Sequence, residues 1–190
     1  MANLMVIFPG LGYTCDRPLL YYARKLASNA GYDTCHTVEY GYIDKTGLIG
    51  NKEKMLEVYK KIKVDADKSL ADIDFSQYEN ILFISKSIGT AVASSFAKEL
   101  ADKSIKVSIK HVLYTPLEQT FIFHPSNAIA FTGTNDPWCN TDEVISLAKK
   151  ENIPIYVYED ANHSLETKDV SLDLDNLKKV MDLTQSFILT

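Results

Sequence analysis

Three side chains in this sequence have the types needed for nucleophilic catalysis, and each lies in a segment that follows an apolar run. They are Ser87, Asp136 and His163. A serine hydroxyl is a weak nucleophile on its own, but an imidazole held by a carboxylate can remove its proton during attack. The elements that surround these residues decide whether the fold brings them together.

The segment around Ser87 predicts a strand, a tight turn and then a helix. The pentapeptide Ser-Lys-Ser-Ile-Gly, residues 85–89, follows the apolar run at 81–84 and precedes the small residues at 90–94. Such a turn lifts one hydroxyl above the end of a sheet and places a helix N-terminus, with its N–H groups, beneath it. A serine at a helix start is also commonly a simple N-cap, so the turn alone leaves both roles open.

The turn resembles the nucleophile elbow of the α/β-hydrolase superfamily, whose motif is Gly-x-Ser-x-Gly. Here Ser85 replaces the first glycine and Gly89 supplies the last. Positions two residues before and after the nucleophile must be small because the turn is sharp, and serine adds only a Cβ and a hydroxyl. Ser85 is a poorer candidate nucleophile, since the bulky Phe83 stands two residues before it.

Asp136 and His163 resemble the acid and histidine loops of that superfamily, in the same chain order of serine, acid and histidine. Asp136 lies within the segment 133–138, just after a predicted strand, and His163 follows the last predicted strand. An aspartate before proline is also a common turn residue, and His163 could equally be an exposed loop histidine. Parallel strands would carry all three loops to one end of the sheet, which favours catalysis. Glu118, after the preceding strand, is the second candidate for the acid.

The resemblance also implies two backbone donors for a developing oxyanion. One is the amide of Ile88, directly after the serine, and the other is the amide of Leu11. Leu11 lies in the loop 9–13, which resembles the superfamily's His-Gly-x segment with Pro9 in place of histidine. A dinucleotide site is disfavoured in this loop, because Cys15 occupies the third glycine position.

Several other residues fall in loops at the same predicted end of the sheet. The candidate substrate-binding residues among them are Gly10, Gly12, Tyr13 and Trp138. The glycines would let the backbone turn closely, and the aromatic rings would line a pocket. Tyr114 is a further aromatic candidate for the pocket, whereas Lys86 is expected to be an exposed side chain at the helix start.

Short β-rich runs alternate with helical patterns, which predicts an α/β three-layer sandwich around a mostly parallel sheet of about six strands. The expected strands cover residues 4–8, 34–40, 79–85, 110–114, 128–132 and 155–158. The expected helices cover residues 17–29, 52–71, 87–102, 141–150 and 174–187, with Asp16 as the N-cap of the first. No repeat or linker divides the 190 residues, so we expect a single domain.

Composition limits the classes of function. Hydrophobic residues make up 46% and charged residues 24% of the chain, as in ordinary soluble domains. A formal charge of −5 argues against nucleic-acid binding, which requires clustered Lys and Arg. The three scattered cysteines have neither metal nor disulfide spacing and suggest reduced thiols in a cytoplasm. The sequence begins without a basic leader, so we expect no signal peptide. It has no apolar stretch of about 20 residues, so we expect no membrane span.

The resemblance implies a serine esterase that works through an acyl-enzyme and needs no metal or organic cofactor. The connection at 115–127 is about a dozen residues, too short for a lid domain, so we expect a small-molecule substrate with a small or exposed acyl group. Thioester or amide hydrolysis by the same fold remains an alternative. Two alternatives from other classes are a non-catalytic ligand-binding protein and a flavodoxin-like or nucleotide-binding domain. The sequence leaves the oligomeric state open.

Overall fold

Six parallel strands form one sheet in the computed structural model, which describes residues 2–103 and 107–190. The spatial order of the strands is β2-β1-β3-β4-β5-β6, and each neighbouring pair is parallel. Their bounds are β1 Ala2–Phe8, β2 Thr34–Thr37, β3 Tyr78–Lys86, β4 Ser108–Tyr114, β5 Ala128–Gly133 and β6 Ile155–Tyr158. The predicted α/β class with a mostly parallel sheet is confirmed.

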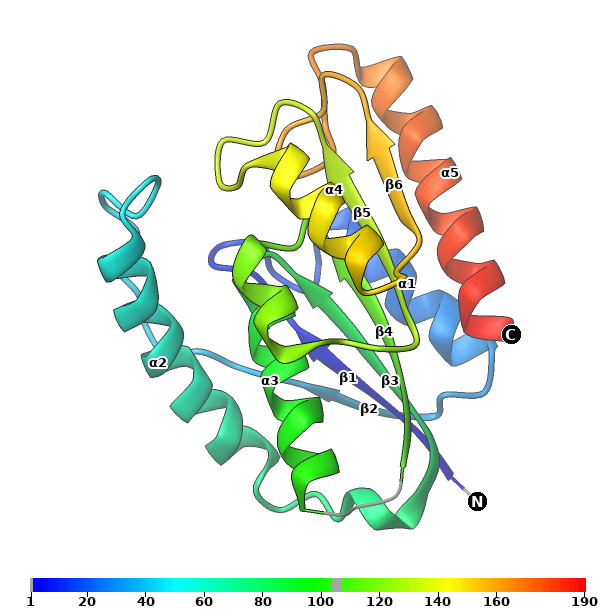
Figure 1. Cartoon of the computed structure of the whole chain (residues 1–190). Coiled ribbons are helices and arrows are strands. Elements are labelled where there is room, and N and C mark those ends of the chain that lie inside the picture. Colours follow the sequence, from blue (N-terminus) through cyan, green and yellow to red (C-terminus); the bar gives the residue numbers. More distant parts are fainter. Residues whose placement is uncertain (1, 104–106) are drawn as a thin grey trace.

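Helices cover both faces of this sheet, which gives three layers (Figure 1). Helices α1 (Pro18–Asn29) and α5 (Val170–Leu189) pack together on one face. Helices α2 (Lys52–Leu70), α3 (Ile88–Asp102) and α4 (Thr141–Lys150) lie on the other. Two short 3₁₀ helices, η1 (Phe75–Gln77) and η2 (Glu118–Phe123), lie in the connections.

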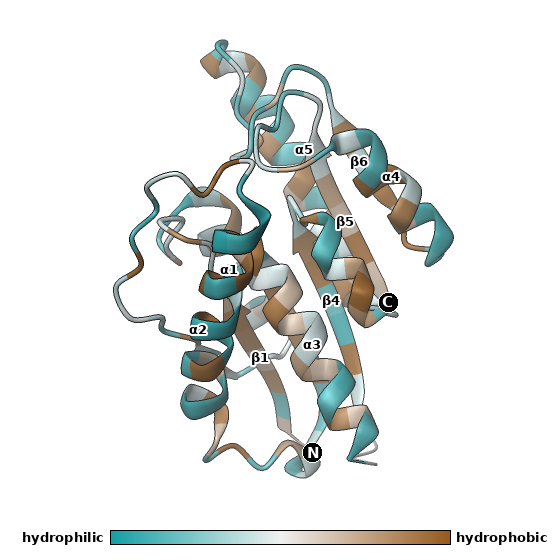
Figure 2. Ribbon diagram, turned by 60° about the vertical axis from the view of Figure 1, so that its left-hand side comes forward, coloured by the Kyte–Doolittle hydropathy of each residue, from teal (hydrophilic) through white to brown (hydrophobic). Residues whose placement is uncertain are grey.

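Alternating side chains of the central strands explain the two cores. In β1, Met5 and Ile7 join the core beneath α1 and α5, whereas Leu4, Val6 and Phe8 join the core beneath α2 and α3. Successive side chains of a strand point to opposite faces, so a strand covered on both sides must be apolar throughout. In Figure 2 strands β1 and β5 are largely brown, whereas the helices alternate between brown and teal.

The structure corrects three details of the sequence prediction. Strand β2 ends at Thr37, and the expected continuation to residue 40 leaves the sheet. Asp16 does not cap α1; Arg17 occupies the N-cap position without a side-chain hydrogen bond, and the helix begins at Pro18, whose fixed φ suits the first turn. The connection 115–127 contains η2, a helix too short for the apolar periodicity to reveal.

The order of the strands determines where a ligand can bind. The chain runs from β1 outward to β2, then crosses back to β3 on the other side of β1. The connection after β1 therefore leads to one side of the sheet and the connection after β3 leads to the other. In open parallel sheets, a crevice forms between two such connections at the carboxyl ends of the strands. The loop after β1 and the turn after β3 meet at this point.

Candidate active site

Ser87 occupies a sharp turn between β3 and α3 with an unusual backbone conformation. Its φ of 58° and ψ of −132° lie outside the regions that non-glycine residues normally adopt. Hydrogen bonds hold the turn: the Ser87 N–H donates to the Tyr114 carbonyl at 2.9 Å, and the Ser87 carbonyl accepts from the N–H and hydroxyl of Thr90. Ser87 stands at the N-cap position of α3, but its hydroxyl makes no capping bond.

Two glycines allow the turn to approach the loop after β1. A Cβ on Gly89 would lie 2.5 Å from the carbonyl oxygens of Phe8 and Pro9, which is an impossible overlap. A Cβ on Gly10 would lie 3.1 Å from the Cβ of Ser87. Ser85, which replaces the motif's first glycine, fits because its hydroxyl donates to the buried Val112 carbonyl.

The hydroxyl of Ser87 lies 2.7 Å from Nε2 of His163, and Nδ1 of His163 lies 2.6 Å from Oδ2 of Asp136. An ionised carboxylate only accepts hydrogen bonds, so the proton of a neutral imidazole belongs on Nδ1 and Nε2 accepts from the serine. The side chain of Asp136 is fully buried, and its Oδ1 accepts from the Trp138 N–H. The indole of Trp138 lies 5.6 Å from the imidazole. The structure therefore joins the three residues that the sequence singled out.

The surroundings of His163 favour a neutral imidazole. Burial lowers the pKa of His163 below its ordinary value, because a charged ring is poorly solvated there, and the charge of Lys86 lowers it further. The hydrogen bond to Asp136 and its charge act in the opposite direction. The neutral ring is the form that can accept a proton from a hydroxyl.

Direct backbone contacts hold the acid loop against the histidine loop. The Asn135 N–H donates to the Ala161 carbonyl, and the Thr134 N–H donates to the Tyr158 carbonyl, each at 3.0 Å. Gly133 makes this approach possible, because a Cβ there would overlap the carbonyl group of Ala161. The spacing between Asp136 and His163 therefore depends on a backbone contact as well as on their own hydrogen bond.

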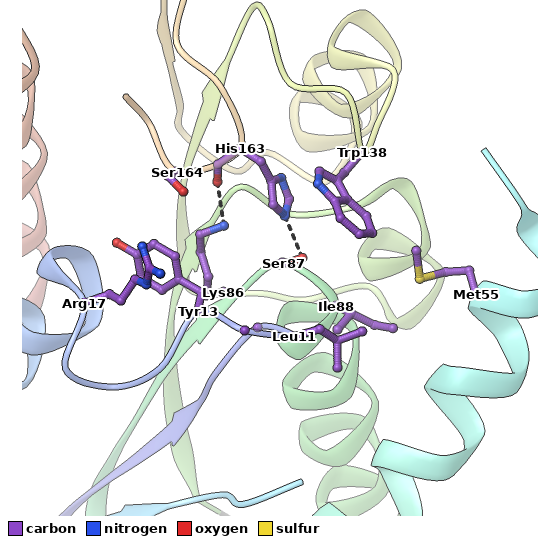
Figure 3. A pocket seen from close by; sticks show the side chains of 12 residues that line it. Leu11, Tyr13, Arg17, Met55, Lys86, Ser87, Ile88, Trp138, His163 and Ser164 are labelled. Atoms are coloured by element: carbon purple, nitrogen blue, oxygen red, sulfur yellow. Dashed lines mark hydrogen bonds between the residues drawn. The ribbon is translucent and has the colours of Figure 1, made fainter. Parts of the chain in front are cut away.

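A cavity of about 220 Å³ opens beside Ser87 and His163 (Figure 3). The residues predicted for the site from the β1–α1 loop all line it, namely Gly10, Leu11, Gly12 and Tyr13. Ile88 and Trp138 line it as well. Sequence reasoning missed Arg17, Met55 and Ser164, which also line it. Arg17 and Tyr13 lie on one side of Ser87 and Met55 on the other. Met55 belongs to α2, and no local motif shows that α2 borders the site.

Other candidates from the sequence lie elsewhere. Glu118 accepts a hydrogen bond from the Asn140 N–H at 2.6 Å, so the structure joins Asp136, not Glu118, to His163. Tyr114 ends β4 inside the core, where its hydroxyl bonds to Thr184, and it does not line the cavity. Of the other histidines, His36 bonds to Ser69, His111 is buried in β4, and His124 bonds to Glu151.

Lys86 contradicts the prediction of an exposed side chain. It is fully buried. The sequence shows only its place beside Ser87, but residue 86 is the last of β3 and lines the cavity. Burial lowers the pKa of Lys86 to about 7, because the ammonium loses its hydration, although Asp136 and Glu166 partly counteract this.

Neither a family model nor a curated protein matches this sequence. Solved structures do resemble it. An α/β serine hydrolase homologue from Coxiella burnetii superimposes with a TM-score of 0.61 at 13% identity, covering 97% of this chain and 84% of that one. An esterase from Pyrococcus furiosus gives 0.61 at 15% identity, covering 98% and 82%.

A Xanthomonas campestris serine hydrolase described as lacking a lid gives a TM-score of 0.59 at 12% identity, covering 98% of this chain and 80% of that one. Likenesses at this level of identity concern the fold. The chain has the α/β-hydrolase fold, as the resemblance of its motifs predicted.

Within 2–103 and 107–190, no helix has the length and apolarity needed to cross a bilayer. Over the same residues, no group of three or more His, Cys, Asp or Glu side chains is arranged to hold a metal ion. The three cysteines are free thiols.

The contact at Gly133 can be tested by Gly133→Ala. We expect a loss of about 1–3 kcal/mol in the free energy of unfolding, because the new methyl must push the histidine loop away from β5. Urea unfolding would measure this loss. Gly41→Ala is the matched control, since a Cβ there meets only Asp65 at 3.5 Å. Equal stability of both variants and the parent would contradict the proposed close contact.

Proposed function

We propose that the protein is a serine hydrolase that cleaves an ester through an acyl-enzyme intermediate on Ser87. The observation that carries the proposal is the unbroken hydrogen-bonded chain from the Ser87 hydroxyl through His163 to the buried Asp136. The alternative roles, a simple N-cap serine and an exposed loop histidine, do not account for the 2.7 Å contact between the two side chains. The strained turn at Ser87 supports the same function.

In the first half of the reaction, Ser87 Oγ attacks the acyl carbonyl while His163 Nε2 takes its proton. Asp136 keeps the other ring proton on Nδ1 and stabilises the imidazolium that forms. The imidazolium then gives its proton to the leaving alcohol as the ester bond breaks. The acyl group remains on Ser87.

In the second half, water attacks the acyl-enzyme with His163 again as the base, and Ser87 is released. The negative oxygen of each tetrahedral intermediate needs donors that are already in place. We assign these to the backbone N–H groups of Leu11 and Ile88, which both belong to residues lining the cavity. Ile88 is the first residue of α3, so the positive end of the helix dipole adds to this stabilisation.

The shape of the surface beside the cavity supports an apolar acyl group. A second hollow of about 110 Å³ lies between α2, α3 and η2 and shares Met55 and Ile88 with the cavity at Ser87. Its lining is mainly apolar and includes Leu56, Tyr59, Leu117, Ile122 and Phe123. Because Ile88 follows the nucleophile directly, this groove offers room for the acyl chain of a bound ester. Leu56 and Ile122 in its lining are more than half exposed, which agrees with the expected exposed acyl group.

Ser87→Ala tests the assignment of the nucleophile. With p-nitrophenyl acetate as substrate, kcat should fall by a factor on the order of 10⁶, because Ser87 supplies the hydroxyl that His163 activates. Circular dichroism would check that the variant keeps its fold. His163→Ala should be similarly impaired. An unimpaired rate in either variant would overturn the mechanism, and an inactive parent on every ester would favour a ligand-binding protein instead.

Ile122→Lys tests the acyl groove. For p-nitrophenyl hexanoate, kcat/KM should fall about 3- to 10-fold, because each buried methylene contributes about 0.8 kcal/mol and a charge would displace the chain. Hydrolysis of the acetate ester should change little. Ile122 is 65% exposed, so folding should survive, and the similarly exposed Val170 on α5 supplies the control Val170→Lys. Equal effects of Ile122→Lys on both esters would exclude this groove as the acyl site.

A further inference from the structure

Lys86 is a buried cation for which the mechanism above has no use. Its side chain is fully buried, and among the residues that the structure describes no carboxylate lies within ion-pair distance of its nitrogen. Removing an ammonium from water without an ionic partner is unfavourable for folding. Such groups concentrate at functional sites, and Lys86 is the immediate neighbour of Ser87.

The contacts of Lys86 join three separate segments around the site. Its Nζ donates to the backbone carbonyl of His163 at 2.6 Å and to the hydroxyl of Thr115 at 2.5 Å. The Thr115 hydroxyl in turn donates to the same His163 carbonyl at 3.2 Å. On the other side, the ammonium lies 5.0 Å from the ring centre of Tyr13, in the loop that carries Leu11. Figure 3 shows the bond from Lys86 to the carbonyl oxygen of His163, beside the imidazole.

The backbone of Thr115 has an unfavourable conformation that its neighbours hold in place. It follows β4 with a φ of 43°, which a β-branched residue rarely adopts. Its N–H donates to the Phe131 carbonyl at 2.7 Å, so β5 fixes its position. The strain persists only because surrounding contacts require it. The result is a hydroxyl aimed at both Lys86 and the carbonyl of His163.

We propose that Lys86 is a positioning residue of the active site: its side-chain nitrogen, with Thr115, ties the loop of His163 to the ends of β3 and β4. This inference rests on the proposed function. The imidazole can reach Ser87 only if the backbone of His163 stays where it is, and the carbonyl of that same residue is the group that Lys86 holds. Displacement of a catalytic group by about 1 Å is enough to cost a large part of the rate.

Lys86 also acts on His163 through its charge. The groups that face His163 are Asp136, which raises the pKa of the ring, and Lys86, which lowers it. Burial lowers the pKa of Lys86 to about 7 and also lowers the pKa of His163 from its ordinary value, so the ammonium of Lys86 opposes protonation of the ring. Removing Lys86 should therefore raise the pKa of His163.

The other groups around Lys86 do not change this expectation. Asp136, Glu166 and Cys139 all act to raise the pKa of Lys86, against the larger effect of burial. Burial raises the pKa of Cys139 to about 12 and that of Tyr13 to about 12, so neither carries a charge near neutral pH. The charge of Lys86 therefore remains the group that lowers the pKa of His163 beside the effect of burial.

Lys86→Met is the direct test, because methionine has nearly the same length and apolarity suits the buried site. With the acetate ester, kcat should fall about 10- to 100-fold, as expected for a catalytic group held loosely, while KM changes less than about threefold. The acidic limb of the kcat/KM profile should move to higher pH. Lys110→Met is the matched control: Lys110 also donates to two backbone carbonyls, those of Phe187 and Ile188, away from the cavity.

Thr115→Val and Thr115→Ser give an independent pair. Valine removes the hydroxyl and should lower kcat, whereas serine keeps it and should lose less. NMR titration of the His163 ring in the parent and in Lys86→Met needs no turnover, and the pKa should be higher in the variant. An inactive parent would overturn the proposed function, and an unchanged His163 titration would overturn the charge effect whether or not the parent is active.

The outcomes of the kinetic experiment also separate the roles of Lys86. A folded Lys86→Met with the parent's kcat and acidic limb would overturn the inference while leaving the hydrolase intact. A raised KM with unchanged kcat would contradict it too, because it would make Lys86 a substrate contact. Loss of rate in Lys110→Met equal to that in Lys86→Met would show a general effect of losing a lysine and would likewise refute positioning.

Discussion

The arrangement of the site depends on one backbone constraint, the tight turn at Ser87 between the end of β3 and the start of α3. Its positive φ is held because the Ser87 N–H donates to the Tyr114 carbonyl and the Ser87 carbonyl accepts from the Thr90 N–H. The same turn requires a residue without a side chain at Gly89, where the loop after β1 passes at a distance that excludes any Cβ. One constraint thus positions the hydroxyl, the Ile88 amide and the loop with Leu11.

A second constraint is the removal of charged groups from water. Asp136 and Lys86 are both buried next to His163, one raising and the other lowering the pKa of the ring. The two side chains do not form an ion pair with each other. Asp136 contacts the ring of His163, and Lys86 contacts its backbone carbonyl. The histidine is therefore held at two atoms by groups that are costly to bury. Such a site is stable only if the surrounding loops stay closely packed.

Much of the architecture follows from the sequence, because it depends on local patterns. The apolar runs of β1 and β3 and the small residues at the start of α3 predicted the sheet and the turn, and the chain order of Ser87, Asp136 and His163 predicted which loops would meet. The environment of Lys86 did not follow, because its burial is set by Tyr13 and Thr115, which are distant in sequence. Met55 was missed for the same reason: the helix period identifies a buried face without saying what it packs against.

The most direct test of the central claim is a crystal structure of the protein after reaction with a small alkyl fluorophosphonate, which mimics the tetrahedral intermediate. The account predicts phosphorus bonded to Ser87 Oγ, with the phosphoryl oxygen within hydrogen-bonding distance of the backbone nitrogens of Leu11 and Ile88. An adduct on another residue, or a phosphoryl oxygen turned away from both nitrogens, would contradict it. So would a protein that remains unmodified after prolonged exposure to the reagent.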